Sequence, residues 1–315
     1  MDNDLVRQAT VSAARLPDFR AAPNQGGHAG LYETENQALD PGGHVLAAMR
    51  ARAPWAGRTL LDLGCGSGYW LAGYAREAAE VIGVEPDPRL LPLAAARDPR
   101  ARVLAGSAEH IPLPGQSVDV VHARFAYFFS PGCDPGLAEV MRVLRPGGTL
   151  VVVGNDLRAG DFAGLLRAAG GALVTAGGEA AEAWWAARGA DRTTVRSCWR
   201  FTSRADFEAV LRMEFPRPVA DRWLAARPGA LGLSYSYALF AVGKPAGLLR
   251  GRSQARPVHR VLGPAVDVAD VAVQRAGAVG PAAVPRDRQQ VSAPEVGGGG
   301  PAGPQAVRAQ RLQHA

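Results

Sequence analysis

Short apolar segments alternate with segments of helical character between residues 59 and 153 of this 315-residue chain. Strands that alternate with helices are typical of a parallel sheet covered by helices on both faces. The segments predicted to be strands are 59–63, 81–85, 102–105, 118–123 and 149–153. Helices are expected at 67–77, 88–97 and 136–144. This alternation predicts a doubly wound α/β fold with a mostly parallel sheet.

A second group of helices is expected between this alternating region and a closing strand at 234–242. The helical segments lie near 162–169, 180–188, 205–213 and 220–226. We therefore expect one domain over 41–245, preceded by a lid or helical segment in 1–40. Within this domain, the insert at about 156–231 is expected to form a helical cap over the acceptor side of the site.

The last 70 residues differ in composition from the rest of the chain. All 21 aromatic residues occur at or before Phe240, and the segment 246–315 is dominated by Gly, Pro, Ala, Val and Arg. Such a composition buries too little apolar surface to offset the loss of chain entropy on folding. We expect 246–315 to be a disordered, low-complexity tail.

Charge and hydropathy argue against several classes of partner. The chain carries a formal net charge of +6, but 246–315 holds nine arginines against four acidic residues, so the remainder carries only +1. A nucleic-acid partner is therefore not expected for the folded part. No apolar run approaches the roughly 18 to 20 residues that cross a bilayer. The start MDNDLVRQAT lacks the features of a secretory signal, which favours a cytoplasmic protein without a membrane partner.

A glycine-rich turn follows the first predicted strand. The segment LLDLGCGSGYW, residues 60–70, places a strand, a turn and the start of a helix in succession. In open α/β sheets a ligand binds at the carboxyl ends of the strands, beside such a turn. Gly64, Gly66 and Gly68 permit unusual backbone angles and a close approach of main chain to the ligand. Asp62 is placed where its carboxylate can meet a cationic ammonium group or orient the turn.

Two nucleotide cofactors compete for this turn. The dinucleotide fingerprint is GxGxxG, whereas this chain has GxGxG followed by Tyr69 and Trp70. Bulky Tyr69 would crowd a pyrophosphate at the start of the helix. S-adenosylmethionine has no phosphates and does not need that space, so the spacing favours it over a nicotinamide dinucleotide.

An acidic residue ends the second predicted strand, in the sequence VIGVEP. Glu85 follows Asp62 by 23 residues, about the separation at which an acid reaches the ribose of a nucleoside bound at the first turn. A carboxylate accepts hydrogen bonds from two hydroxyl groups, and charge-assisted bonds are the stronger kind. Glu85 is thus the best single candidate for a cofactor contact, and Asp87 is either a second contact or a helix cap.

Four segments, in order, resemble the motifs of class I S-adenosylmethionine-dependent methyltransferases of the type 11-like group, which act on small molecules. They are LLDLGCGSG, VIGVEP, GSAEHIPLPGQSVDVV and RVLRPGGTLVVV. The resemblance covers roughly residues 30–245. It implies a Rossmann-like seven-stranded sheet, bound S-adenosyl-L-methionine and transfer of its methyl group to a small-molecule acceptor.

The resemblance also implies a set of cofactor contacts. Those to the methionine part would be Asp62, Gly64, Cys65, Gly66 and Gly68, and the ribose contact would be Glu85. The contacts beside the adenine would be Ser107, Ala108 and Glu109, and those near the centre of the cofactor Ala123 and Arg124. Serine at position 107 departs from the aspartate that is usual there.

Two further regions are expected to border the substrate. The segment LYETENQALDPGG resembles the leading lid of such enzymes, so Tyr32 and Asn36 are candidates for contact with cofactor or substrate. The segment RFAYFFSPG follows the fourth predicted strand. Its aromatic side chains either line an apolar acceptor pocket or join the core; they are Phe125, Tyr127, Phe128 and Phe129.

Methyl transfer from a sulfonium is an in-line displacement, for which positioning supplies much of the catalysis. An oxygen or nitrogen acceptor also needs a general base, and His122, Tyr127 and His110 are candidates. No CxxC pair or other metal-ligand spacing is present, so no metal is expected. A catalytically silent cofactor-binding regulator and a nicotinamide-dependent reductase remain alternatives. The sequence identifies neither the acceptor atom nor the oligomeric state.

Overall fold

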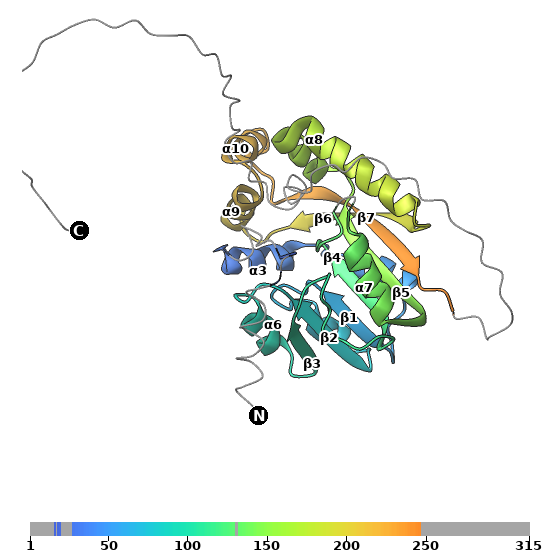
Figure 1. The fold of residues 1–315 in the computed structure, drawn as a ribbon. Helices are drawn as coiled ribbons and strands as arrows, with labels where there is room; N and C mark the ends of the chain where they lie inside the picture. The colour runs from blue at the N-terminus through green and yellow to red at the C-terminus, as the bar shows by residue number, and fades with distance from the viewer. Residues whose placement is uncertain (1–15, 17, 20–26, 130–131, 247–315) are drawn as a thin grey trace, which may run out of the picture. The chain divides into compact units, whose positions relative to one another are not determined.

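The computed structural model of the protein describes residues 16, 18–19, 27–129 and 132–246. Seven strands form one sheet in the spatial order β3-β2-β1-β4-β5-β7-β6 (Figure 1). The strands are β1 (Thr59–Leu63), β2 (Glu80–Glu85), β3 (Ala101–Ala105), β4 (Val118–Arg124), β5 (Leu144–Asn155), β6 (Asp191–Arg200) and β7 (Gly232–Gly243). All but the first residue of the predicted tail lies outside the described residues.

All strands of the sheet except β7 run in the same direction. β1 pairs in parallel with β2 and β4, β2 with β3, and β4 with β5. β7 pairs antiparallel with both β5 and β6, so it alone runs against the other six. The predicted mostly parallel, seven-stranded sheet is therefore confirmed. Because parallel strands end at the same edge of a sheet, the segments that follow β1, β2 and β4 meet there.

Helices cover both faces of this sheet. They are α3 (Ala29–Ala38), α4 (His44–Arg52), α5 (Leu71–Tyr74), α6 (Leu91–Arg97), α7 (Asp134–Val143), α8 (Asp161–Ala186), α9 (Arg204–Glu214) and α10 (Arg217–Ala225). Side chains alternate along β1, so that Leu60 joins one core cluster while Leu61 and Leu63 join the other. In the described part of the chain, no helix has the length and apolar character needed to span a bilayer.

Two helix predictions are wrong in extent. The helix expected at 67–77 is only α5, because the backbone keeps positive φ angles at Gly64 (72°), Gly66 (61°) and Gly68 (77°) and does not become helical until later. The helices expected at 162–169 and 180–188 correspond to the two parts of α8, of which the second begins earlier than expected. The two parts are separated by a kink at Gly171, whose φ of 58° and ψ of −141° lie outside the helical range.

The insert at 156–231 is not helical throughout, contrary to the prediction. It contains β6, which pairs with β7 over its whole length and forms the edge of the sheet. In the sequence of β6, DRTTVRSCWR, only Val195 and Trp199 are fully buried. An edge strand with few buried side chains lacks the apolar run by which the other strands were predicted.

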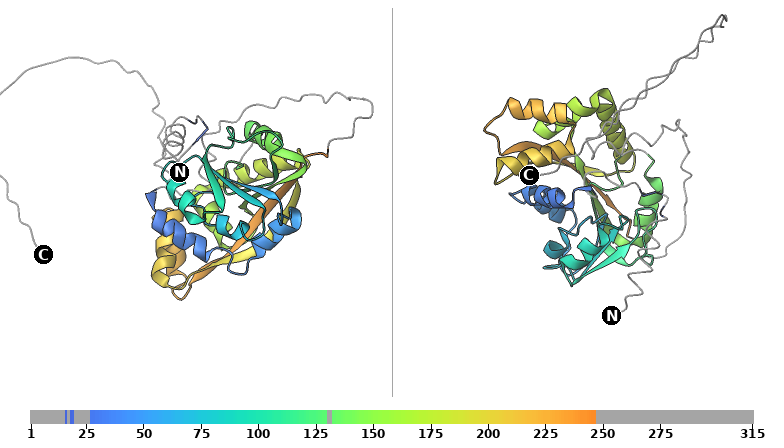
Figure 2. Two further views of the ribbon diagram at one scale, coloured as in Figure 1. Left: turned by 90° about the horizontal axis from the view of Figure 1, so that it is seen from below. Right: turned by 90° about the vertical axis from the view of Figure 1, so that its left-hand side faces the viewer.

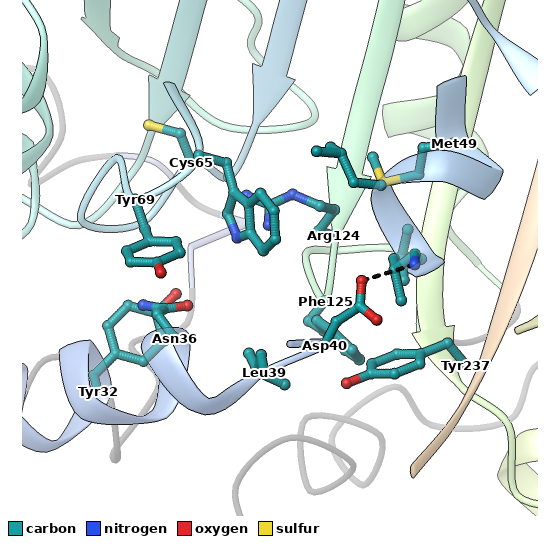
Figure 3. A pocket seen from close by; sticks show the side chains of 15 residues that line it. Tyr32, Asn36, Leu39, Asp40, Met49, Cys65, Tyr69, Arg124, Phe125 and Tyr237 are labelled. Carbon is teal, nitrogen blue, oxygen red and sulfur yellow. Dashed lines mark hydrogen bonds between the residues drawn. The ribbon is translucent and has the colours of Figure 1, made fainter. Parts of the chain in front are cut away.

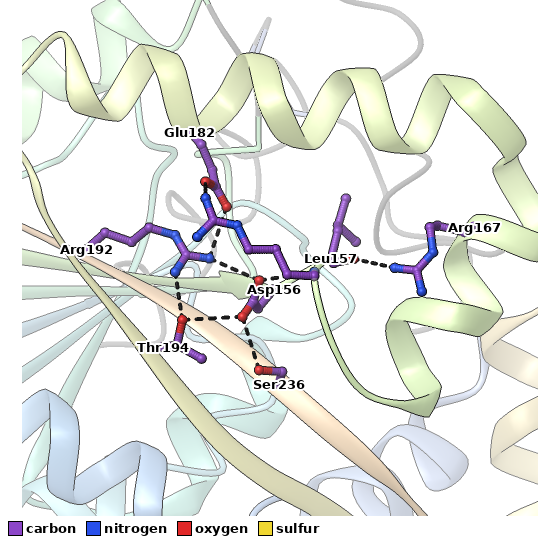
Figure 4. Close-up of polar contacts among 8 residues, drawn as sticks. Asp156, Leu157, Arg167, Glu182, Arg192, Thr194 and Ser236 are labelled. Carbon is purple, nitrogen blue, oxygen red and sulfur yellow. Dashed lines mark hydrogen bonds and ion pairs between the residues drawn. The ribbon is translucent and has the colours of Figure 1, made fainter.

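A buried carboxylate ties this edge of the sheet together. Asp156 follows β5, is 2% exposed, and accepts hydrogen bonds from Arg192 of β6 at 3.0 Å and from Ser236 of β7 at 3.1 Å (Figure 4). Arg192 also donates to Glu182 of α8 at 3.0 Å. Because charged groups are buried only when paired, this network fixes β6, β7 and α8 relative to one another.

The segment before β1 is held over the carboxyl edge of the sheet. α3 packs against α9 (Figure 2). Between α3 and α4, the carboxylate of Asp40 accepts hydrogen bonds from the backbone N–H groups of His44 at 3.0 Å and Val45 at 2.8 Å. It also accepts one from the Ser197 hydroxyl of β6 at 2.6 Å. Asp40 thereby caps α4 and anchors it to the sheet edge.

Candidate functional site

The glycine turn after β1 has a backbone that only glycine can adopt without strain. A Cβ atom at Gly64 would lie 2.5 Å from the Cβ atom of Ala126, and one at Gly68 would lie 2.8 Å from the Cα atom of Ala94. A Cβ atom at Gly66 would lie 3.0 Å from the Tyr32 hydroxyl. The turn is therefore enclosed by neighbouring chain on all three sides, and its own main chain faces the carboxyl edge of the sheet.

The side chain of Glu85 supports this turn from the end of β2. Glu85 is 5% exposed, and its carboxylate accepts hydrogen bonds from the backbone N–H of Gly66 at 2.8 Å and of Asp87 at 2.9 Å. Each carboxylate oxygen has a further lone pair. The ribose contact stays a prediction, for which the position beside the glycine turn is suitable.

Asp87 is engaged by a neighbouring arginine. Its carboxylate accepts a hydrogen bond from the backbone N–H of Arg89 at 2.9 Å and forms an ion pair with the Arg89 guanidinium at 2.6 Å. Burial acts to raise the pKa of Asp87, but the hydrogen bonds from Arg89 outweigh burial and lower the pKa. Asp87 therefore stays ionised at neutral pH and organises the turn before α6.

An ion pair lies beneath the glycine turn. Asp62 at the end of β1 is fully buried, and its Oδ2 atom accepts a hydrogen bond from the Arg124 guanidinium at 3.3 Å. The ring of Trp70 covers that guanidinium, with its centroid 4.5 Å from the central carbon. The two residues meet because β1 and β4 are neighbours in the sheet.

The residues predicted to lie beside the adenine contact the N-terminal segment. The Ser107 hydroxyl donates to Asp18 at 2.8 Å, and the backbone N–H of Glu109 donates to the same carboxylate at 3.3 Å. Ala108 is buried in the core cluster that also contains Ala123. None of these positions borders the cavity described next, and their contacts with a cofactor stay predictions.

A cavity opens between the glycine turn, α3, α4 and the ends of β4, β5 and β7 (Figure 3). Its volume is only ≈ 40 Å³, well below the roughly 300–1,000 Å³ of ligand pockets. The side chains thus fill most of the space, and a ligand of nucleoside size requires some of them to move.

Four predicted cofactor contacts line this cavity together with residues that the sequence did not single out. The predicted ones are Tyr32, Gly64, Cys65 and Arg124. Asn36 and Phe125, which were expected to border cofactor or acceptor, also line it. The additional lining residues are Leu39, Asp40, Val45, Leu46, Met49, Tyr69, Trp70, Val153 and Tyr237. Among the residues whose side chains are described, none from 156–231 lines the cavity, and the acceptor cap expected there stays a prediction.

The cysteine of the glycine turn is chemically quiet. Burial raises the pKa of the Cys65 thiol well above its usual value, and the negative charges of Glu85 and Asp62 raise the pKa further. Since the thiolate is the nucleophilic form, this thiol is unreactive at neutral pH. Cys65 therefore contributes shape rather than covalent chemistry. Among the described residues, no group of three or more potential ligands could hold a metal ion.

The predicted general bases do not lie in the cavity. His122 is fully buried between the rings of Trp55 and Tyr74, with centroid distances of 5.3 and 5.2 Å. Burial, and then the charge of Arg124, lowers the pKa of His122 to about 3. The Tyr127 hydroxyl donates to Glu109 at 2.7 Å, and burial followed by this bond raises the pKa of Tyr127. The ring of His110 lies 3.5 Å from the carboxylate of Asp18, which also accepts the hydrogen bond from the backbone N–H of Glu109.

The aromatic segment after β4 divides between cavity and core. Phe125 lines the cavity and packs against Tyr237, with a centroid distance of 6.0 Å. Phe128 instead packs in the core on the opposite face of the sheet, 5.6 Å from the ring of Trp185. Positive φ angles at Phe125 (50°) and Tyr127 (55°) turn successive rings to different sides. Phe125 therefore borders the cavity and Phe128 joins the core, whereas a contact of this segment with a methyl acceptor stays a prediction.

Part of this site lies in a segment that matches a known protein family. Residues 61–152, which carry the glycine turn, Glu85 and Arg124, match the family described as methyltransferase domain. An uncharacterized methyltransferase of Mycobacterium tuberculosis is 37% identical over 132 residues, 41% of this chain and 51% of that protein. Malonyl-[acyl-carrier protein] O-methyltransferase of Serratia marcescens is 30% identical over 160 residues, 51% of this chain and 57% of that protein. The chain thus spans about half the length of the curated relatives it matches.

Solved structures resemble the chain only distantly. A SAM-dependent methyltransferase from Aquifex aeolicus has a TM-score of 0.37 and 20% identity, over 42% of this chain and 74% of that one. At this level of similarity the assignment depends on the sequence match. Residues 61–152 thus match the methyltransferase domain family, and over this region the chain is similar in sequence to methyltransferases.

Proposed function

We propose that this chain is an enzyme that transfers a methyl group from S-adenosylmethionine to a small-molecule acceptor. The observation that carries the proposal is the glycine turn, which has no room for a Cβ atom at Gly64 and Gly68 and borders the cavity through Gly64 and Cys65. The buried carboxylate of Glu85 holds that turn in place. The methyltransferase match over the same residues supports the proposal.

The chemistry asks little of the protein beyond positioning. When bound, the cofactor would supply a methyl group on a positively charged sulfur; in-line attack of an acceptor atom on the methyl carbon would break the sulfur–methyl bond and release S-adenosylhomocysteine. Holding an acceptor in that line is worth on the order of 7–11 kcal/mol in favourable cases. Closure of the cavity around a bound acceptor would also exclude water from the acceptor atom. We assign these two tasks to the residues that line the cavity opposite the glycine turn.

The acceptor side of the cavity is mostly apolar. Phe125, Met49 and Leu39 line it, and Tyr237 contributes its ring from β7 (Figure 3). Burial, and then the negative charges of Asp40 and Glu35, raises the pKa of Tyr237 well above its usual value. Its hydroxyl therefore stays neutral and can exchange a hydrogen bond with an acceptor, but it does not serve as a base. These features support a small, largely apolar acceptor with one polar group.

A small molecule is favoured over a macromolecule as the acceptor. The cavity is narrow, and residues 1–245 carry a formal net charge of only +1, which gives no electrostatic footprint for nucleic acid. One relative is named malonyl-[acyl-carrier protein] O-methyltransferase, which supports a small acyl or similar group as the methylated part. The acceptor atom is left open between oxygen, nitrogen and carbon.

Two measurements test the proposed function. Calorimetry of the full chain with S-adenosylmethionine and with S-adenosylhomocysteine should give saturable binding of both, whereas NAD and NADP should give none. Incubation with cofactor carrying a labelled methyl group and fractionated host extract should then transfer label to a small compound. Absence of binding would refute the proposal. Tight binding without label transfer to any fraction would instead support a cofactor-binding regulator.

A further inference from the structure

A second pocket lies at the edge of the sheet, outside the cavity of the proposed methyl-transfer site. Its volume is ≈ 350 Å³, within the roughly 300–1,000 Å³ of ligand pockets. Its walls come from β6 and from the turn between α3 and α4. The residues that line this β6 pocket are Pro41, Gly42, His44, Arg196, Ser197, Cys198 and Arg200. These described residues include two arginines and a histidine but no acid, so the pocket is electropositive.

The two arginines of the β6 pocket have no carboxylate partner. Arg192, Arg196 and Arg200 follow one another at four-residue intervals along β6, so they point to the same side of the sheet. Arg192 pairs with the carboxylates of Asp156 and Glu182, each at 3.0 Å. Within the described ranges of the chain, the side chains of Arg196 and Arg200 form neither an ion pair nor a hydrogen bond. Their guanidinium donors are therefore available to a ligand.

An acid next to the β6 pocket is engaged elsewhere. Asp40 is 6% exposed and lines the cavity on the other side of the turn, where its carboxylate lies near Phe125 and Tyr237 (Figure 3). As described above, its oxygens accept hydrogen bonds from two backbone N–H groups of α4 and from the Ser197 hydroxyl. Asp40 thus shapes the turn and does not neutralise the two arginines inside the pocket.

We propose that the β6 pocket binds the phosphate monoester group of a small molecule. Arginine binds phosphate through paired, charge-assisted hydrogen bonds. A phosphate monoester carries a charge of about −1.5 to −2 at neutral pH and three acceptor oxygens, so it can engage Arg196 and Arg200 together. A carboxylate carries a single charge and matches only one of them. The inference goes beyond the proposed function, because S-adenosylmethionine has no phosphate.

The β6 pocket and the cavity share one wall. In the segment 40–45, Asp40 and Val45 line the cavity. The intervening residues Pro41, Gly42 and His44 line the β6 pocket. A phosphate held in the pocket therefore touches the segment that closes the cavity. The phosphate belongs either to the methyl acceptor, whose apolar end would enter the cavity, or to a separate small molecule.

Titration of the full chain with inorganic phosphate tests the site directly, at constant ionic strength because salt screens exposed charges. The backbone amide signals of residues 196–200 in NMR spectra should shift saturably, and acetate should bind about fivefold more weakly or less. Arg196→Gln and Arg200→Gln should each weaken phosphate binding about fivefold or more, because each removes charge-assisted contacts. The matched control is Arg76→Gln, at an exposed arginine outside the pocket. It should bind phosphate like wild type.

Two results would overturn the site. One is the absence of saturable phosphate binding by wild type. The other is unchanged binding by a folded chain that carries both Arg196→Gln and Arg200→Gln; self-association of that variant would then show that the arginines protect the sheet edge from pairing with another chain. Neither result affects the proposed function, which is tested separately by calorimetry with S-adenosylmethionine.

The source of the phosphate is distinguished by the product of label transfer. This arm depends on the proposed function, since it uses cofactor with a labelled methyl group and fractionated host extract. A labelled product whose mass falls on treatment with a phosphatase places the phosphate on the methyl acceptor, and its formation should be reduced in the double variant. A labelled product that resists the phosphatase assigns the pocket to a separate phosphate-bearing molecule.

Discussion

The carboxylate of Glu85 accepts a hydrogen bond from the backbone N–H of Gly66 at 2.8 Å. This bond joins the end of β2 to the turn that follows β1, so the acid that we assign to the ribose also shapes the loop that holds the rest of the cofactor. Loss of the Glu85 side chain should therefore weaken cofactor binding directly, through the proposed ribose contact, and indirectly, through the glycine turn.

Glu85→Ala should weaken binding of S-adenosylmethionine at least tenfold, because it removes the proposed ribose contact and releases the Gly66 backbone. Calorimetry with the folded variant measures this. Glu80→Ala, at the exposed start of the same strand, is the matched control, since the Glu80 side chain is 49% exposed. It should bind like wild type. Wild-type affinity in Glu85→Ala would remove the ribose assignment.

Gly66→Val should also weaken cofactor binding at least tenfold. The substituted residue would have to keep a φ of 61° and would approach the Tyr32 hydroxyl, 3.0 Å from the new Cβ atom, so the turn has to shift. Gly73→Ala in α5 provides the control, because a Cβ atom there meets nothing within 4 Å. Its affinity should be unchanged and its unfolding free energy equal or slightly higher. A folded Gly66→Val with native affinity would contradict the role of the turn.

The two neighbouring tyrosines of β7 should respond differently to loss of the hydroxyl. The Tyr235 hydroxyl donates a hydrogen bond to Asn155, whereas the buried Tyr237 hydroxyl has only a weak interaction with the side chain of Trp199. In urea unfolding, Tyr235→Phe should lose about 0.5–1.5 kcal/mol. Tyr237→Phe should stay within about 0.5 kcal/mol of wild type. A larger loss in Tyr237→Phe would show that its hydroxyl stabilises the fold rather than awaiting an acceptor.

His122 should make the stability of the fold depend on pH. Burial lowers its pKa to about 3 in the folded state, against about 6.5 when unfolded. The folded state therefore binds fewer protons between these values, and stability present above pH 6.5 is lost as the pH falls towards 3. Between pH 6.5 and 5.0 this amounts to about 2 kcal/mol. His122→Phe, measured by urea unfolding at both pH values, should show a correspondingly smaller loss; identical losses would refute the assignment.

Local sequence was sufficient to predict the glycine turn and the acidic residue that supports it. Gly64, Gly66 and Gly68 have positive φ angles that glycine favours, and Glu85 ends a short apolar strand, so strand, turn and acid were each recognisable within a few residues. The parallel strands of 59–153 were predicted for the same reason, since each is an apolar run bounded by polar residues.

The features that the sequence did not predict depend on contacts between distant segments. β6 was missed because an edge strand buries only Val195 and Trp199, so its sequence has no apolar run. Tyr237 reaches the cavity only because β7 pairs with β5, where Tyr237 lies opposite Asn155. Likewise, the sequence around His122 did not predict that Trp55 and Tyr74 enclose its ring, because these residues lie in two other segments.

The reversed direction of β7 has a consequence for the newly synthesised chain. Because β7 runs antiparallel, its early residues lie at the carboxyl edge, and Tyr237 completes a cavity whose glycine turn was made about 170 residues earlier. A ribosome-bound fragment that ends before β7 has the glycine turn but lacks Tyr237 from the proposed acceptor side of the cavity. Competence to methylate should therefore appear only when the last strand has left the exit tunnel, well after the α/β core has begun to form.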